Sequence, residues 1–195
     1  MRIARIIRSN SHVDYVARVI DSLESAAPPS AMDYPFGQFV SVACAHSQAV
    51  GVIYNSQLIN PDYGNSGPRL SSPPELNSVF SPDYLHEQGV LLGILLLGSA
   101  GGAQRRQGVP REVAPVNANV EVMDEDAIRA FHGNAAGALE LRYYAHVVTH
   151  GGLFAFQLLD TIVERLEQLG GAHDRARLHV LRGALAWQQT MGTMR

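Results

Sequence analysis

Hydrophobic and polar residues alternate in short runs along the first two-thirds of the chain, as they do in strands that bury one face. The runs at 2–8 and 13–21 flank a polar turn and predict one hairpin, and residues 38–54 predict a second that turns near 46–48. Residues 88–97 are hydrophobic on both faces, which is typical of a central strand. With a last run at 116–122, about six closely spaced strands are predicted, a pattern that favours a small closed barrel over an open sheet.

The hydrophobic period changes from two to about 3.6 residues at Asp124. Asp124, Glu125 and Asp126 suit a helix start, because carboxylates accept hydrogen bonds from free amides and complement the helix dipole, and we assign them no catalytic role. This helix should end at Gly133, and residues 153–169 and 172–191 predict two more. Residues 139–148 fit a helix or a strand, and we favour the helix. The predicted fold class is α+β, with a β-barrel over residues 1–123 and a helical region over 124–195.

Residues 55–83 are rich in proline and glycine and predict a long irregular connection that is functional or partly mobile. The longest hydrophobic run has 8 residues, whereas a membrane-spanning helix needs about 20. The N-terminus lacks the hydrophobic stretch of a secretory signal. We therefore expect no membrane partner and a cytoplasmic location.

The chain has no lysine, so all 15 of its Lys/Arg positions are arginine. The absence of lysine excludes Schiff-base chemistry and the phosphate-binding lysine of a standard P-loop. We therefore expect no nucleotide hydrolysis. We also assign the chain no cofactor and no catalytic residue. The formal net charge is -3, so any binding of nucleic acid would have to come from a local basic patch.

Two histidine-containing motifs have the spacing of metal-binding or catalytic pairs. His146 and His150 lie four residues apart, which places two imidazoles on one face of a helix, but Val147 stands where zinc proteases carry a glutamate. A metal-dependent hydrolase using this pair is one alternative, with a polar surface stripe as the simpler interpretation. Cys44 and His46 would share a strand face, but no nucleophile elbow accompanies them.

The segment 101–111 is the best candidate for anion or partner contact. Its glycines free backbone amides, and Arg105, Arg106 and Arg111 offer forked donors for phosphate or carboxylate groups. Solvent exposure is the usual fate of such a loop. A nucleic-acid-binding barrel that uses these arginines is a second alternative.

The two C-terminal helices carry more hydrophobic surface than a two-helix unit can bury by itself. We expect part of it to lie on the barrel and part on a partner or on a second copy of the chain. The predicted contact face consists of Phe154, Phe156, Leu159, Ile162, Val163 and Trp187.

Five segments, taken in order, carry a family resemblance over residues 1–132. They are IARIIRS, YPFGQFVSV with Gly37, AVGVIYNSQLINPDY with Gly51, GVLLGILLLG, and VPREVAPVNANVEVMDEDAIRAF, which runs into a helix. In this order they resemble the HAS barrel, the small β-barrel at the front of HerA-type DNA-translocating ATPases and of rotary ATP synthase subunits.

In such ATPases a motor with Walker motifs follows the barrel, whereas here about 60 residues remain, without a phosphate loop. The resemblance therefore implies a stand-alone, non-catalytic barrel for assembly or docking. Its implied partner is a HerA-like ring ATPase or further copies of the same chain, with nucleic acid contacted only indirectly or through a local loop.

Overall fold

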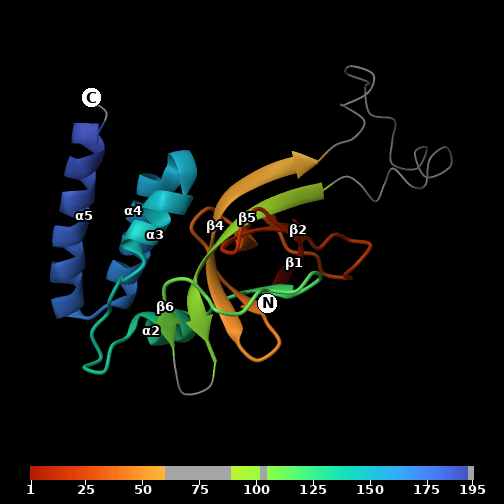
Figure 1. Ribbon diagram of the computed structural model, residues 1–195, viewed down its shortest axis with the longest axis horizontal. Coiled ribbons are helices and arrows are strands. Elements are labelled where there is room, and N and C mark those ends of the chain that lie inside the picture. The colour runs from red at the N-terminus through yellow and green to blue at the C-terminus, as the bar shows by residue number, and fades with distance from the viewer. Residues whose placement is uncertain (60–88, 102–104, 193–195) are drawn as a thin grey trace.

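Six antiparallel strands close into a barrel, and helices lie against one side of it (Figure 1). The computed structural model describes residues 1–59, 89–101 and 105–192. The strand order is β2-β1-β7-β3-β4-β5, and pairing of β5 with β2 closes the circle. The strands are β1 (Arg2–Ser9), β2 (Asp14–Val19), β3 (Phe39–Ala43), β4 (Gln48–Ile59), β5 (Gly89–Ala100) and β7 (Asn119–Val122). The predicted α+β fold with a barrel of about six strands is confirmed.

The two predicted hairpins are β1–β2 and β3–β4. Strand β4 continues to Ile59, five residues into the predicted irregular connection, and the rest of that connection lies outside the described residues. A short strand that the sequence did not predict, β6 (Arg106–Gln107), pairs with the end of β5. The segment expected to be an arginine loop is therefore partly anchored to the sheet.

Strand β5 is buried on both faces along most of its length, as its unbroken hydrophobic run predicts. Along its edge with β2, Leu92 pairs with Ala17, and both residues are fully buried. At Leu96 the strand meets the helical side, because the Leu96 carbonyl oxygen lies 2.8 Å from the imidazole of His146. The strand thus separates the barrel interior from the helices.

The helices are α2 (Glu125–His132), α3 (Tyr144–His150), α4 (Ala155–Leu169) and α5 (Ala172–Gly192), with short 3-10 turns η1 (Ala31–Asp33) and η4 (Gly152–Phe154). Helix α2 begins and ends as predicted, because the Asp124 carboxylate accepts a 2.7 Å hydrogen bond from the Ala127 amide and Gly133 follows the last turn. Of the segment 139–148, only the second half is helical. Leu139 instead forms an isolated bridge with Gly133, and its amide donates to Asp174, so the chain stays irregular up to α3.

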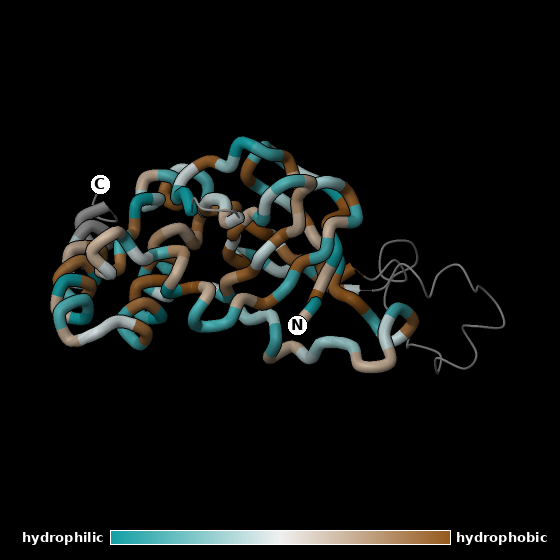
Figure 2. Tube along the Cα trace, turned by 90° about the horizontal axis from the view of Figure 1, so that it is seen from below, coloured by the Kyte–Doolittle hydropathy of each residue, from teal (hydrophilic) through white to brown (hydrophobic). Residues whose placement is uncertain are grey.

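Helix α4 lies between the barrel and α5 (Figure 1). Its approach to the barrel depends on Gly37, which has φ +83 and leaves room for the Thr161 side chain where a Cβ atom would collide. On the other side, Arg182 of α5 binds the Asp160 carboxylate at 2.7 and 3.3 Å. Hydrophobic and hydrophilic positions alternate along both helices (Figure 2), and one hydrophobic core continues from the barrel into them.

Candidate functional site

Two cavities flank the segment that joins α2 to α3. The first has a volume of about 400 Å³ and is lined by Arg105, Arg106, Gln107, Phe131, His132, Gly133, Asn134, Ala135, Glu140 and Arg142. The second has a volume of about 350 Å³ and is lined by Leu139, Glu140, Leu141, Arg142, Arg177, Leu178 and Leu181. Because Glu140 and Arg142 line both, we treat the two cavities as one surface and call it the arginine groove.

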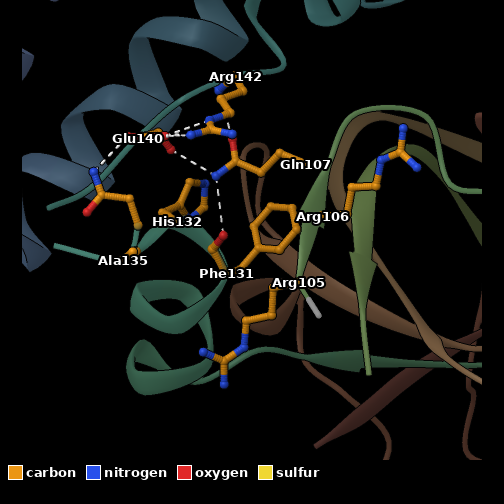
Figure 3. A pocket seen from close by; sticks show the side chains of 10 residues that line it. Arg105, Arg106, Gln107, Phe131, His132, Ala135, Glu140 and Arg142 are labelled. Carbon is orange, nitrogen blue, oxygen red and sulfur yellow. Dashed lines mark hydrogen bonds and ion pairs between the residues drawn. The ribbon is translucent and has the colours of Figure 1, made fainter. Parts of the chain in front are cut away.

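The side chain of Gln107 joins β6 to the segment between α2 and α3 (Figure 3). Its Nε2 donates to the carbonyl oxygens of Phe131 at 3.2 Å and Glu140 at 2.9 Å, while its Oε1 accepts from the Arg142 amide at 2.7 Å. One side-chain amide thus joins β6 to the end of α2 and to residues 140–142, which precede α3. Sequence reasoning missed this residue, because no local pattern marks it.

The three arginines predicted to form an anion site do not converge. Arg105 turns toward α2, where it donates to the Ala130 carbonyl oxygen at 3.1 Å, and Arg106 points away from it (Figure 3). Arg111 is exposed and lines neither cavity. The basic character of the groove comes instead from Arg105 and Arg106 together with Arg142 and Arg177, two arginines that the sequence analysis did not select.

Glu140 is the carboxylate of the arginine groove. It accepts hydrogen bonds from Asn134 at 2.7 Å and from Arg142 at 2.6 Å. These two bonds, the Asn134 bond first, hold the pKa of Glu140 below its usual range. Arg142 nevertheless stays largely open to solvent, since 70% of its side chain is exposed.

A buried polar pair lies beneath the first cavity. The His132 Nε2 lies 2.7 Å from the Tyr143 hydroxyl, and its Nδ1 lies 2.8 Å from the Ile128 carbonyl oxygen. A neutral imidazole satisfies both contacts by donating from Nδ1 and accepting at Nε2. Burial lowers the pKa of His132 to about 4, because the site disfavours the charged form. The pair is therefore structural and leaves no free imidazole nitrogen to act in the groove.

His146 and His150 lie together on α3 as predicted, with ring centroids 4.8 Å apart. The Nε2 of His146 is taken up by the Leu96 carbonyl oxygen, and burial lowers the pKa of His146. No set of three or more metal-binding side chains occurs within the part of the chain that the structure describes. Among those residues, the pair thus lacks the further ligands that a catalytic metal site requires.

Cys44 and His46 lie at the tip of the β3–β4 hairpin, where a third side chain, that of Glu112, takes up the neighbouring donors. Glu112 accepts from the Ser47 hydroxyl at 2.6 Å and from the His46 amide at 2.9 Å. Burial, the larger cause, and the nearby Glu112 charge raise the pKa of Cys44, which disfavours a thiolate nucleophile. The arrangement fastens the hairpin tip to the segment before β7.

The predicted contact face on the C-terminal helices is only partly available. Leu159, Ile162 and Val163 are fully buried in the chain's own core, so these three residues have no surface left for a partner, and the expectation is corrected at these positions. They are covered because α4 is sandwiched between the barrel and α5. Phe156 is partly buried, whereas Trp187 remains exposed at 65% and Phe154 at 54%.

Exposed hydrophobic side chains gather where α4 begins and α5 ends. Phe154 contacts Phe36 edge to face, with ring centroids 6.2 Å apart, and Leu153 is 98% exposed. The Arg182–Asp160 contact fixes α4 and α5 as antiparallel neighbours, which brings Trp187 to the same end of the helix pair as Phe154. Trp187 lies about 200° around α5 from the buried Leu185, so it projects from the side of α5 that faces away from α4. We call Phe36, Leu153 and Phe154, together with the separate side chain of Trp187 at the same end of the molecule, the end patch.

A β-barrel with helices on one side is thus the architecture that carries both surfaces, the arginine groove and the end patch. The family model described as Domain of unknown function (DUF8166) matches residues 1–195, and the chain belongs to this family. No curated protein matches the chain. Within the described residues, none of the helices combines the length and the hydrophobicity that crossing a bilayer requires.

Proposed function

We propose that the chain is a non-catalytic assembly module, a barrel that docks on a HerA-type ring ATPase or builds a ring with copies of itself. The resemblance of residues 1–132 to the HAS barrel supports this proposal. The observation that carries it is the end patch, because exposed hydrophobic patches of this kind mark surfaces that bind other proteins.

The end patch is large enough to matter. Large side chains present roughly 150–250 Å² each, so the exposed fractions of Leu153 (98%), Phe154 (54%) and Phe36 (38%) leave on the order of 400 Å² open. Trp187 (65%) adds on the order of 100 Å² on the outer side of α5. A contact that covers such a patch on each of two partners buries on the order of 1,000 Å², the lower bound for a specific interface.

Several groups with catalytic potential are engaged within the fold, which also favours a structural role. His132 is bonded to Tyr143, His146 faces the Leu96 carbonyl, and Ser47 donates to Glu112. A metal-dependent hydrolase would need ligands beyond His146 and His150. A nucleic-acid-binding barrel would need several arginines directed at the same stretch of backbone phosphates, whereas Arg105 and Arg106 point in different directions.

Light scattering of the full chain tests the proposal. The wild-type protein alone at micromolar concentration should show a mass above that of the 21.1 kDa chain, or, when mixed with a purified HerA-type ATPase, it should co-elute with the ATPase and raise the mass of that peak. The double variant Leu153→Ser/Trp187→Ser should weaken this association by roughly 30-fold, because a buried tryptophan contact contributes about 2 kcal/mol. Val116→Ser, at an exposed valine outside the end patch, is the matched control and should associate normally.

A wild-type chain that stays near 21.1 kDa both alone and with the ATPase would contradict the proposal. So would association that the double variant retains in full, because the end patch would then not be the contact surface.

A further inference from the structure

We propose that the arginine groove binds an acidic peptide segment of a partner protein, one in which aspartate or glutamate residues stand beside hydrophobic ones. This inference rests on the proposed docking function and names the chemistry of one partner. It follows from the charge of the groove, from its hydrophobic floor and from the packing of its aromatic residues.

The charge of the groove is unbalanced. Four arginines line it, Arg105, Arg106, Arg142 and Arg177, against the single carboxylate of Glu140. The lining side chains alone carry +3, or +2 when Asp174 beside Arg177 is counted, in a chain whose formal net charge is -3. An acidic ligand would therefore be attracted to this place on the surface in preference to the rest of the molecule.

The arginines keep donors free for a ligand. Arg142 is bonded to Glu140 but its side chain is 70% exposed, and Arg177 is 50% exposed with its nearest carboxylate, that of Asp174, 3.8 Å away. A guanidinium has five N–H donors, so one carboxylate partner does not saturate it. Both side chains can form forked hydrogen bonds with a ligand carboxylate without giving up the contacts they have.

The floor of the second cavity is hydrophobic. Leu139 and Leu178 are buried at its base, while Leu141 and Leu181 are partly buried and line it between the arginines. A peptide with alternating acidic and aliphatic residues is complementary to this surface, because its carboxylates can bind the arginines while its aliphatic side chains pack on the leucines. A small free anion would leave this floor uncovered.

The groove lacks the features of a nucleic-acid site. Single strands are bound by stacking bases on exposed aromatic faces. The aromatic rings that line the first cavity are those of Phe131 and His132, which are 3% and 1% exposed and pack against each other with ring centroids 5.0 Å apart. They offer no face to a base, so the charge and the floor together favour a peptide.

Fluorescence anisotropy with three labelled probes tests the inference on the full chain. The first is a synthetic peptide of about 12 residues, long enough to span roughly 40 Å, in which aspartate and glutamate alternate with leucine and valine. The second replaces every acid by its amide, and the third is oligothymidylate of the same length. We expect the acidic peptide to bind at least about tenfold more tightly than either control probe.

Variants assign the binding to the groove. Arg142→Gln/Arg177→Gln should weaken acidic-peptide binding by about tenfold or more, because the loss of even one charged hydrogen bond lowers affinity roughly tenfold. Arg142→Lys/Arg177→Lys keeps the charge and should recover part of the affinity. Arg8→Gln/Arg111→Gln removes two exposed arginines outside the groove and should bind as the wild type does.

Equal weakening in both glutamine double variants would overturn the inference, since the attraction would then come from overall charge. Tighter binding of oligothymidylate, or no binding of the acidic peptide at low salt, would overturn it too. The mass measurement separates these failures from that of the proposed function. A wild-type chain that associates through the end patch but ignores the peptide refutes the groove alone.

Discussion

Lowering the pH from 7 to 5 should destabilise the protein by about 2 kcal/mol through one buried side chain, His132. Its pKa is about 4 in the folded chain, against 6.5 for an ordinary histidine. Below pH 6.5 the His132 imidazole is therefore protonated in the unfolded chain, whereas in the folded chain it stays neutral down to about pH 4. The stability that neutral His132 provides is complete above pH 6.5 and is lost as the pH falls toward 4.

Urea unfolding followed by circular dichroism at pH 7 and pH 5 measures this loss. With an m-value of about 2 kcal/mol per molar urea, the wild-type midpoint should fall by roughly 1 M. In His132→Gln the group that titrates is gone, so most of the difference between the two pH values should disappear. His173→Gln, at an exposed histidine on α5, is the control and should retain the full difference.

His146 contributes in the same direction, because its pKa is also lowered by burial, but it is only half-buried and should add less. The reasoning would be refuted if wild-type midpoints agreed at the two pH values. It would be refuted equally if His132→Gln kept the wild-type pH dependence, because another group would then have to be responsible.

Two further substitutions test the packing around the arginine groove. Gly98→Ala should lower the free energy of unfolding by about 1–3 kcal/mol, because the new Cβ atom would collide with the Arg106 carbonyl oxygen and lie 2.8 Å from the Phe131 ring. An unchanged urea midpoint would refute this prediction. Gln107→Glu should lower the free energy of unfolding by about 2 kcal/mol, because a carboxylate cannot donate hydrogen bonds to the Phe131 and Glu140 carbonyl oxygens. A thermal unfolding curve at pH 7 that matches the wild type would contradict this prediction.

The parts of the fold that the sequence predicted are those with a local signal. The two hairpins follow from alternation between turn residues, and the start of α2 follows from the carboxylate of Asp124 next to a change of period. Strand β5 followed from a hydrophobic run typical of a strand that is buried on both faces. In each case the signal and its physical cause lie close together along the chain.

The parts that could not be predicted depend on contacts between distant segments. Strand β6 has two residues, too few to show a period, and it exists because Gly98 and Ser99 offer it an edge. The second cavity of the groove brings Arg142 and Arg177 together, and this depends on the packing of α5 beside residues 139–142. Hydrophobicity likewise marked α4 as covered on two sides, but it could not show that the barrel and α5 already cover Ile162 and Val163.

The two proposed surfaces lie far enough apart to be occupied together. Helix α5 contributes Arg177 to the arginine groove and Trp187 to the end patch, and at 1.5 Å per residue these positions lie about 15 Å apart along the helix. Mutations more than about 10 Å apart that share no partner usually have additive effects, so substitutions at the two surfaces should act independently. The helix is also fastened between them by Arg182, which binds Asp160 of α4, so occupation of one end need not shift the other. A module that joins one protein to another requires two such separate surfaces on a rigid support, and α5 contributes to both.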